Sequence, residues 1–318
     1  MILAAGLSPA WQQIVLLQAL RLGEVNRAQE VHWCASGKVG NVAIALRHLG
    51  QNVPPVRRSS DTTMLTLRGG ITGEALQREL VEWGIDCRWV VTAAPTRVCT
   101  TLLDLQQSIT TEIVENAGAI STDELAEFRS LFGDAAGAAN VIVLTGSFPA
   151  GVPVDFYRQL VTSAPETARI LIDAQGESLR SSCEAKPFLV KPNREELGRT
   201  LGRTLHSDAD VWEAMESLQQ LGAQNVLVTQ GAGPVRLSFG NRRFQFAPFP
   251  ISVVNPIASG DCLAAGIAWG LDNGKDLTES VRIGISAAAD NAEQLLPARL
   301  NRQSVLARAL QIAMQEIV

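Results

Sequence analysis

A short stretch in the last third of the chain has the composition of an anion-binding helix start. It runs Asn255-Pro256-Ile257-Ala258-Ser259-Gly260-Asp261 and continues into small and apolar residues that predict a helix. Small side chains let the backbone N–H groups of a helix N-terminus approach an anion, and the positive end of the helix dipole adds to this attraction. Asp261, in the first turn, could accept a proton from an attacking hydroxyl while phosphate charge is stabilised nearby. The alternative is that Asp261 only caps a helix that packs against a sheet.

Asn193 and Glu196 stand three residues apart, where a predicted strand ends and a helix begins. At that spacing the two side chains share one face of the helix. A carboxylate and an amide there could hold Mg²⁺ through its waters, because this ion keeps much of its hydration shell and is usually shared with substrate phosphates. The alternative is an ordinary helix start, with Asn193 as N-cap and Glu196 as its N3 partner.

A third cluster, Ser36-Gly37-Lys38-Val39-Gly40-Asn41, precedes a helix rich in Ala and Leu. It is not a Walker A loop, because Val39 follows Lys38 where that motif requires Ser or Thr. The sequence also lacks a Gly-x-Gly-x-x-Gly run and a Gly-x-Ser-x-Gly elbow. Any nucleotide binding must therefore use another scheme.

The elements that must position these residues alternate between strand and helix. Four short apolar runs, each closed by a turn or polar residue, predict buried central strands at residues 141–144, 170–173, 188–190 and 226–229. Capping signals at Ser121 and Ser207 open helices between them. This alternation predicts an α/β fold with a mainly parallel sheet and helices packed on its faces. Residues 11–31 and 88–115 have a β-rich texture instead, and we expect them to form a small accessory sheet.

The composition is that of a globular protein and excludes several functions. With 318 residues, 46% of them hydrophobic, the chain suits one large domain. A net charge of -5 gives no basic footprint for nucleic acid or an anionic membrane. No apolar stretch approaches the ~18 residues that span a bilayer, and no basic residue precedes the apolar N-terminus as in a signal peptide. Five cysteines without a C-x-x-C pair favour free thiols in a reducing cytoplasm, and the three histidines lack zinc-site spacing.

Taken together and in order, these and further stretches resemble the ribokinase/PfkB carbohydrate kinase family, in particular its 1-phosphofructokinase and tagatose-6-phosphate kinase branch. The matching stretches are Gly23-Glu24-Val25-Asn26-Arg27, Gly37-Lys38 with Asn41, Gly69-Gly70-Ile71-Thr72-Gly73, Thr96-Arg97, Thr111-Glu112-Ile113, Thr145-Gly146-Ser147-Phe148-Pro149-Ala150-Gly151, Lys191-Pro192-Asn193 with Glu196, Gly231, and Ala258-Ser259-Gly260-Asp261. The resemblance covers nearly the whole chain. It implies a single ribokinase-like kinase domain over residues 1–318, with a doubly wound sheet, helices on both faces, and a small β-sheet lid. The lid strands would lie within about 8–33 and 88–115.

The resemblance also implies roles for the matching residues. Asp261 would be the catalytic base for attack on the γ-phosphate of ATP, with an anion hole formed by Ala258, Ser259 and Gly260. The sugar-phosphate site would comprise Gln12, Arg27, Gly37, Lys38, Asn41 and Arg97, with the two arginines meeting the phosphate already on the substrate. The nucleotide site would comprise Lys191, Asn193, Thr229, Gly231 and Asn291. Asn193 and Glu196 would organise Mg²⁺ through water.

Four positions depart from the family pattern. Gln12 stands where relatives have Asp, and a neutral acceptor binds sugar hydroxyls more weakly by roughly 1 kcal/mol per bond. Val39 adds bulk where the backbone would approach the ligand. Ala258 replaces the first glycine of the anion hole, at a cost of about 1 kcal/mol if that position needs a positive φ. Pro234 removes one N–H from the nucleotide loop.

Three functions are compatible with these residues. The first is ATP- and Mg²⁺-dependent phosphorylation of fructose 1-phosphate at its 6-hydroxyl to fructose 1,6-bisphosphate, with tagatose 6-phosphate or fructose 6-phosphate as alternative acceptors. The second is a catalytically silent sensor of a sugar phosphate or nucleotide, which the departures would suit. The third, a kinase for an unphosphorylated sugar or nucleoside, would leave Arg27, Lys38 and Arg97 without an anion. We expect a cytoplasmic homodimer formed through the lid, with neither nucleic acid nor membrane as a partner.

Overall fold

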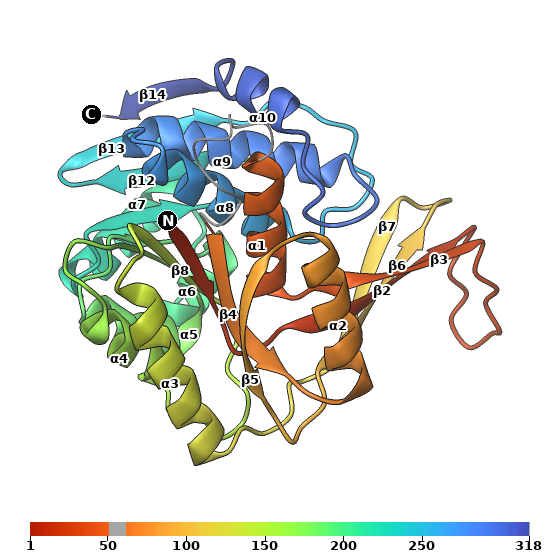
Figure 1. Ribbon diagram of the computed structural model, residues 1–318. Helices are drawn as coiled ribbons and strands as arrows, with labels where there is room; N and C mark the ends of the chain where they lie inside the picture. Colours follow the sequence, from red (N-terminus) through yellow and green to blue (C-terminus); the bar gives the residue numbers. More distant parts are fainter. Residues whose placement is uncertain (51–61, 318) are drawn as a thin grey trace.

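A large, twisted sheet runs through the molecule (Figure 1). The computed structural model describes residues 1–50 and 62–317, and within them ten strands form this sheet in the order β14-β13-β12-β11-β10-β9-β8-β1-β4-β5. The strands are β1 (Ile2–Ala5), β4 (Thr62–Arg68), β5 (Asp86–Val91), β8 (Val141–Thr145), β9 (Arg169–Asp173), β10 (Leu189–Val190), β11 (Asn225–Val228), β12 (Val235–Phe239), β13 (Arg242–Ala247) and β14 (Ala313–Ile317). Neighbours from β11 to β5 are parallel, whereas β12, β13 and β14 pair antiparallel.

The four central strands predicted from apolar runs are confirmed as β8, β9, β10 and β11. Every residue of β8, β10 and β11 is buried. A parallel strand that is covered on both faces reads as a continuous apolar run rather than an alternating one, which explains why these strands were visible in the sequence.

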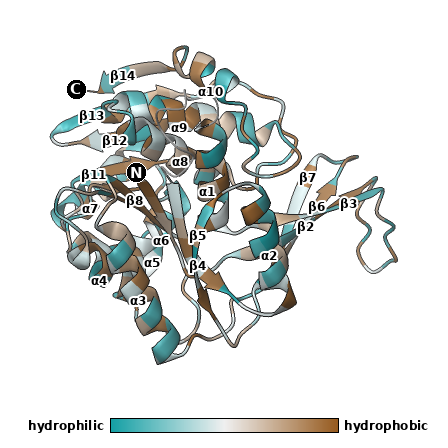
Figure 2. Cartoon of the chain, in the orientation of Figure 1, coloured by the Kyte–Doolittle hydropathy of each residue, from teal (hydrophilic) through white to brown (hydrophobic). Residues whose placement is uncertain are grey.

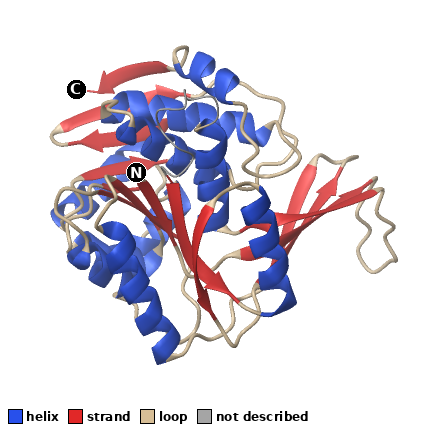
Figure 3. Cartoon of the chain, viewed as in Figure 1, coloured by secondary structure: helices blue, strands red, loops and turns tan. Residues whose placement is uncertain are grey.

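Helices cover both faces of the large sheet (Figure 3). One hydrophobic cluster joins the sheet to α1 (Lys38–Leu49), α2 (Gly70–Glu82), α8 (Ser259–Asp272), α9 (Leu277–Ala292) and α10 (Arg302–Ala309). A second cluster joins the other face to α3 (Thr122–Ala136), α4 (Phe156–Ser163), α5 (Gly176–Cys183), α6 (Arg194–Leu201) and α7 (Asp208–Gln220). The fold is therefore a mainly parallel α/β sheet with helices on both faces, as predicted. Among the described residues, no helix combines the length and apolarity that crossing a bilayer requires.

Two of these helices begin at the capping signals seen in the sequence. Ser121 and Ser207 are the N-caps of α3 and α7, and each closes a capping box with the acidic residue three positions on. In each box the hydroxyl accepts from the N3 backbone while the carboxylate accepts from the N-cap backbone, so two otherwise unpaired N–H groups are satisfied.

A separate small sheet projects from the side of the molecule (Figure 1). It contains β2 (Ala10–Leu17), β3 (Glu30–Ser36), β6 (Arg97–Asp104) and β7 (Ile109–Val114) in the order β3-β2-β6-β7. One expectation differs, because residues 88–91 belong to β5 of the large sheet rather than to the small one. Strand β5 follows β4 and α2 in a parallel crossover, and its Val90 is fully buried in the main core. Its alternating sequence does not reveal that pairing.

Candidate active site

A cavity of about 920 Å³ opens where the two sheets meet. The residues at or just after the carboxyl ends of β8, β9, β10 and β11 line it, as do the first turn of α8 and one face of the small sheet. In open α/β sheets, ligands bind at the carboxyl ends of the strands. The residues named from the sequence that line this cavity are Gln12, Gly37, Lys38, Asn41, Arg97, Lys191, Asn193, Glu196, Thr229, Gly231, Ala258, Ser259, Gly260 and Asp261.

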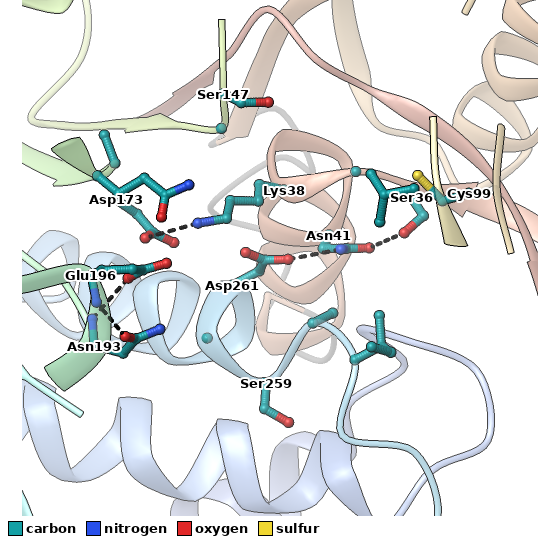
Figure 4. A pocket seen from close by; sticks show the side chains of 18 of the residues that line it. Ser36, Lys38, Asn41, Cys99, Ser147, Asp173, Asn193, Glu196, Ser259 and Asp261 are labelled. Carbon is teal, nitrogen blue, oxygen red and sulfur yellow. Dashed lines mark hydrogen bonds and ion pairs between the residues drawn. The ribbon is translucent and has the colours of Figure 1, made fainter. Parts of the chain in front are cut away.

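Asp261 lies in the first turn of α8, where it is buried but still lines the cavity. Asn41 Nδ2 donates to Asp261 Oδ2 at 2.8 Å, and Ser36 Oγ donates to Asn41 Oδ1 at 3.0 Å, which fixes the orientation of the amide (Figure 4). Burial raises the pKa of Asp261 to about 7, although the Lys38 ammonium opposes that rise. A carboxylate with a pKa near neutrality is suited to accept a proton from a hydroxyl.

The backbone before Asp261 has features suited to binding an anion. Ala258 is the N-cap of α8 and has a φ of 69°, in the left-handed region, so the strain expected for alanine here is present. In the part of the chain that the structure describes, the Gly260 N–H donates to no backbone acceptor. Lys191 Nζ lies 3.6 Å from the position of a Cβ built on Gly260. A free N–H at a helix N-terminus beside an ammonium group favours a phosphate oxygen.

Asp173, at the carboxyl end of β9, is a site residue that the sequence reading did not identify. Its Oδ1 accepts from Lys38 Nζ at 3.2 Å and lies 3.3 Å from Lys191 Nζ. Burial alone would raise the pKa of Asp173, but the two ammonium groups hold it below its usual value. For Lys38, burial alone would lower the pKa, and the carboxylates of Asp173, Asp261 and Glu196 raise it above its usual value. Both charges are therefore maintained at neutral pH.

Asn193 and Glu196 form a capping box at the start of α6. Asn193 Oδ1 accepts from the Glu196 N–H at 2.8 Å, and Glu196 Oε2 accepts from the Asn193 N–H at 2.8 Å (Figure 4). The ordinary helix-start reading of this pair is therefore correct. It does not exclude a metal-binding role, because both side chains also line the cavity and the second carboxylate oxygen of Glu196 takes no part in the box.

The donor set on this side of the cavity fits a hydrated Mg²⁺. Asp173 Oδ2 is buried and has no hydrogen-bond partner among the described residues. An unpaired buried carboxylate oxygen is costly unless a cation or an ordered water meets it. Together with the free oxygen of Glu196, it offers the hard oxygen ligands that Mg²⁺ binds directly or through water.

The small sheet forms the opposite wall of the cavity. Strand register places Gln12 between Cys34 and Cys99 in one row that continues to Val114, and three of these four residues line the cavity. Gln12 Nε2 donates to Thr101 Oγ1 at 2.8 Å, so its amide oxygen is the group left for a ligand. This row therefore presents one neutral acceptor among weakly polar and apolar side chains.

Arg97 stands beside that row at the start of β6 and also lines the cavity. Its guanidinium donates to the backbone oxygens of Glu115 and Ser8, both at 3.2 Å. Its buried Nε has no partner among the described residues. The guanidinium is thus held in one orientation at the edge of the cavity, with donor capacity left for an anion.

A model of the pfkB family of carbohydrate kinases matches residues 11–298. The chain belongs to this family. It is 29% identical over 294 residues to 1-phosphofructokinase of Bacillus subtilis (strain 168), which covers 92% of each chain. Phosphofructokinase-2 from Escherichia coli, solved in complex with fructose-6-phosphate, has a TM-score of 0.85 at 23% identity, over 98% of this chain and 99% of that one. A possible 1-phosphofructokinase from Thermotoga maritima has a TM-score of 0.89 at 19% identity and covers both chains fully.

As a member of the pfkB family, the protein is an ATP-dependent carbohydrate kinase, in agreement with the motifs in its sequence. Two residues that the motifs assigned to the site lie away from the cavity of this kinase. Arg27 is exposed on the long loop between β2 and β3. Asn291 is fully buried near the end of α9, where its Nδ2 donates to Ile257 O at 2.8 Å and to Ser259 Oγ at 3.0 Å. Asn291 therefore contacts the loop before α8 on the side that faces away from the cavity.

Two of the family departures also lie outside the cavity of this kinase. Val39 packs into the hydrophobic core between α1 and the large sheet, and it does not line the cavity. The expectation that Val39 adds bulk beside the ligand is therefore wrong, because the second residue of α1 points toward the sheet. Pro234 is half-buried after the turn that follows β11 and is likewise not part of the lining. Gln12 and Ala258 are the departures that line the cavity.

Proposed function

We propose that this kinase transfers the γ-phosphoryl group of ATP to a ketohexose phosphate, with the 6-hydroxyl of fructose 1-phosphate as the first candidate acceptor and fructose 1,6-bisphosphate as the product. The observation that carries the proposal is the buried Asp261 carboxylate beside an anion-binding helix N-terminus. A phosphorylated acceptor is supported by the Arg97 guanidinium beside the small-sheet row and by the name of the Bacillus subtilis relative. Tagatose 6-phosphate and fructose 6-phosphate are alternative acceptors.

We propose that the two substrates occupy different parts of the cavity. The triphosphate of ATP would lie over Gly260 and Lys191, with Thr229 and Gly231 beyond them, and the sugar would lie between Asp261 and the small sheet. As the acceptor oxygen bonds to the γ-phosphorus, the bond to the bridging oxygen of ADP breaks and Asp261 takes the hydroxyl proton. Asn41 orients the carboxylate for that transfer. The developing negative charge would be met by the Gly260 N–H and the helix dipole.

Mg²⁺, when bound with ATP, neutralises part of the phosphate charge. Asp173, Asn193 and Glu196 are the residues that we propose hold it, directly or through water. Lys38 and Lys191, both within 3.3 Å of Asp173 Oδ1, would keep Asp173 ionised and fix its orientation.

The decisive test measures conversion of ATP to ADP with Mg²⁺ and a panel of acceptors: fructose 1-phosphate, fructose 6-phosphate, tagatose 6-phosphate, fructose and ribose. We expect turnover with a ketohexose phosphate and its loss in Asp261→Asn. Turnover only with an unphosphorylated sugar would refute the proposed acceptor class. Tight binding of ATP and a sugar phosphate by calorimetry, with no turnover on any acceptor, would identify a sensor instead.

We also propose that the kinase forms a homodimer through the small sheet. The face of this sheet turned away from the cavity exposes Val31, Trp33 and Ile113, with Ile109 at its rim, and each is close to half exposed. Figure 2 shows brown, hydrophobic segments along the strands of the small sheet. Trp33 also stacks on Trp11 with ring centroids 6.3 Å apart, which holds a flat apolar surface in place. A half-exposed apolar patch on a sheet face is a typical protein interface, and a second copy supplies a matching face by two-fold symmetry.

The oligomeric state of two variants tests this dimer. Trp33→Arg places a charge within the exposed apolar patch, and we expect light scattering to show that it converts a dimer into a monomer. Leu310→Arg is the matched control, because Leu310 is an exposed leucine at the end of α10, distant in the fold from the small sheet. A wild-type protein that is monomeric at micromolar concentration would refute the dimer.

A further inference from the structure

Residues 254–260, the loop before α8 and the first two residues of that helix, are the anion-hole loop. It is hydrogen-bonded to residues 291–299, which comprise the end of α9 and the loop after it. Besides the two bonds from Asn291 Nδ2 to Ile257 and Ser259, the backbone N–H groups of Val254 and Asn255 donate to Ala292 O at 2.8 and 3.1 Å. Asn255 Nδ2 also donates to Leu295 O at 2.9 Å. The loop that carries Ala258 in a strained conformation is therefore fixed by this segment, not only by its own helix.

The same segment contacts the small sheet on its other side. Leu295 and Leu296 pack against Ile14, Cys34 and Leu103, on the sheet face that also carries Gln12. In Figure 1 the blue loop after α9 lies beside the base of the small sheet. Residues 291–299 thus lie between the anion-hole loop and the sheet that forms the acceptor wall.

An ion pair strengthens that connection. Arg299 donates through one terminal nitrogen to Glu79 Oε1 at 2.5 Å, and Glu79 Oε2 accepts from the Ala35 N–H at 2.6 Å. Both side chains are mostly buried, and the Arg299 guanidinium lies 4.7 Å from the centroid of the Trp83 ring. Ala35 belongs to β3, an edge strand whose outward N–H would otherwise lack a partner. Glu79 therefore joins the end of β3 to Arg299.

The Glu79–Arg299 ion pair connects to Asp261 through Ala35 and to the anion-hole loop through Ala298. On one side, Ala35 is followed by Ser36, which donates to Asn41 and through it orients Asp261. On the other side, Asn291 Oδ1 accepts from the Ala298 N–H at 2.7 Å, next to Arg299, while its Nδ2 holds Ser259. A series of hydrogen bonds, of which those to Glu79 and Asp261 are charge-assisted, therefore links the strand that orients the base to the loop that forms the anion hole.

We propose that Arg299 and Asn291 are positioning residues, which hold the anion-hole loop at a fixed distance from β3 during phosphoryl transfer. The proposal rests on the phosphoryl transfer proposed above. Neither residue lines the cavity, so neither contacts the substrates. Their effect is on the relative position of the base and the anion hole, where a displacement of about 1 Å can lower a rate about 100-fold.

Arg299→Gln removes the ion pair, and Arg243→Gln is its matched control. Arg243 also pairs with a carboxylate, Glu216, and also stacks on an aromatic ring, that of Trp212. These three residues belong to β13 and α7, and none of them lies in the segment 291–299. We expect Arg299→Gln to lower kcat for fructose 1-phosphate about 10- to 100-fold while both KM values stay within about threefold. Arg243→Gln should stay near wild type.

Hydrogen exchange of the unliganded protein tests the positioning role without any sugar substrate. In Arg299→Gln we expect amides within residues 255–263 to exchange about tenfold faster, with no such change in Arg243→Gln. Equal acceleration in both variants, or none in Arg299→Gln, would overturn the proposal. Glu79→Gln, which can still accept from Ala35, should shift exchange in the same direction by less, and it serves if Arg299→Gln does not fold. A further outcome is that the wild type does not turn over fructose 1-phosphate while Arg299→Gln still exchanges faster. That outcome would refute fructose 1-phosphate as the substrate but not the positioning of the loop.

Discussion

The proposed role of Asp261 as the base predicts how activity depends on pH. Its carboxylate is held by Asn41, and burial raises its pKa to about 7, so only part of the enzyme carries the base in its ionised form at neutral pH. We predict that kcat rises through about pH 7 and is constant above it, because the protonated acid cannot take a second proton. Asp261→Asn should lower kcat by about 10²- to 10⁴-fold. A wild-type kcat that does not change between about pH 6 and 8 would contradict this role for Asp261.

The same carboxylate should affect stability with the opposite trend. The pKa of Asp261 is higher in the folded protein than the usual aspartate value of 3.8, so the folded state binds this proton more tightly than the unfolded state. The contribution of Asp261 to the free energy of unfolding should therefore fall as the pH rises from about 4 to about 7. Asp261→Asn removes that fall and should be more stabilising at pH 8 than at pH 5, measured by urea unfolding. An equal effect at both pH values would show that the pKa of Asp261 is not raised in the folded protein.

Ala258 adopts a φ of 69°, which an L-residue adopts at a cost. Ala258→Gly should stabilise the protein by up to about 1 kcal/mol, partly offset by the greater freedom of glycine in the unfolded chain. Ala126→Gly is a matched control, because Ala126 is exposed within α3, where glycine costs about 1 kcal/mol. Opposite signs for the two variants in urea unfolding are the expected result. Destabilisation by both would show that the alanine is not strained.

At the scale of elements, the start of α6 combines a cap with a proposed metal ligand. Glu196→Gln keeps an oxygen that can accept from the Asn193 N–H but removes the charge, so the Mg²⁺ concentration for half-maximal activity should rise about 10-fold with little change in stability. Asn193→Ala should instead lower the free energy of unfolding by about 1 kcal/mol, because the cap is lost. Kinetics at fixed ATP and varied Mg²⁺, with urea unfolding of each variant, separate the two effects. An unchanged Mg²⁺ dependence in Glu196→Gln would contradict its role as a ligand.

Helices and strands could be predicted from the sequence where their signal lies within a few consecutive residues. The runs that became β8 and β11 are apolar along their whole length because both faces are covered, and the boxes at Ser121 and Ser207 are complete within four residues. Strand β5 was not recognised as part of the large sheet. Its residues alternate like those of the small sheet, and only its pairing with β4 distinguishes it.

For the whole molecule, contacts that are distant in sequence limited the prediction of the site. Asp173 could be recognised as the polar end of a buried strand, but its two lysine partners, Lys38 and Lys191, come from elements on either side of it in the chain. Asn291 was assigned to the nucleotide by motif alone, whereas the fold turns its amide toward Ser259. Motif order identifies which residues matter, and only the three-dimensional packing shows which of them face the cavity.

The hydrogen bond from Asn41 to Asp261 spans 220 positions of the chain, and so does the ion pair of Glu79 with Arg299. Synthesis at roughly 5–20 residues per second separates the two ends of either contact by roughly 10–45 s. During that interval β1 and α1 exist without α8, which covers them in the finished protein, so apolar surface of α1 stays exposed on the ribosome. Such late closure slows folding and favours chaperone binding of the nascent chain. The proposed base, Asp261, lies in the last fifth of the chain, so a nascent chain that ends before it cannot carry out the proposed transfer.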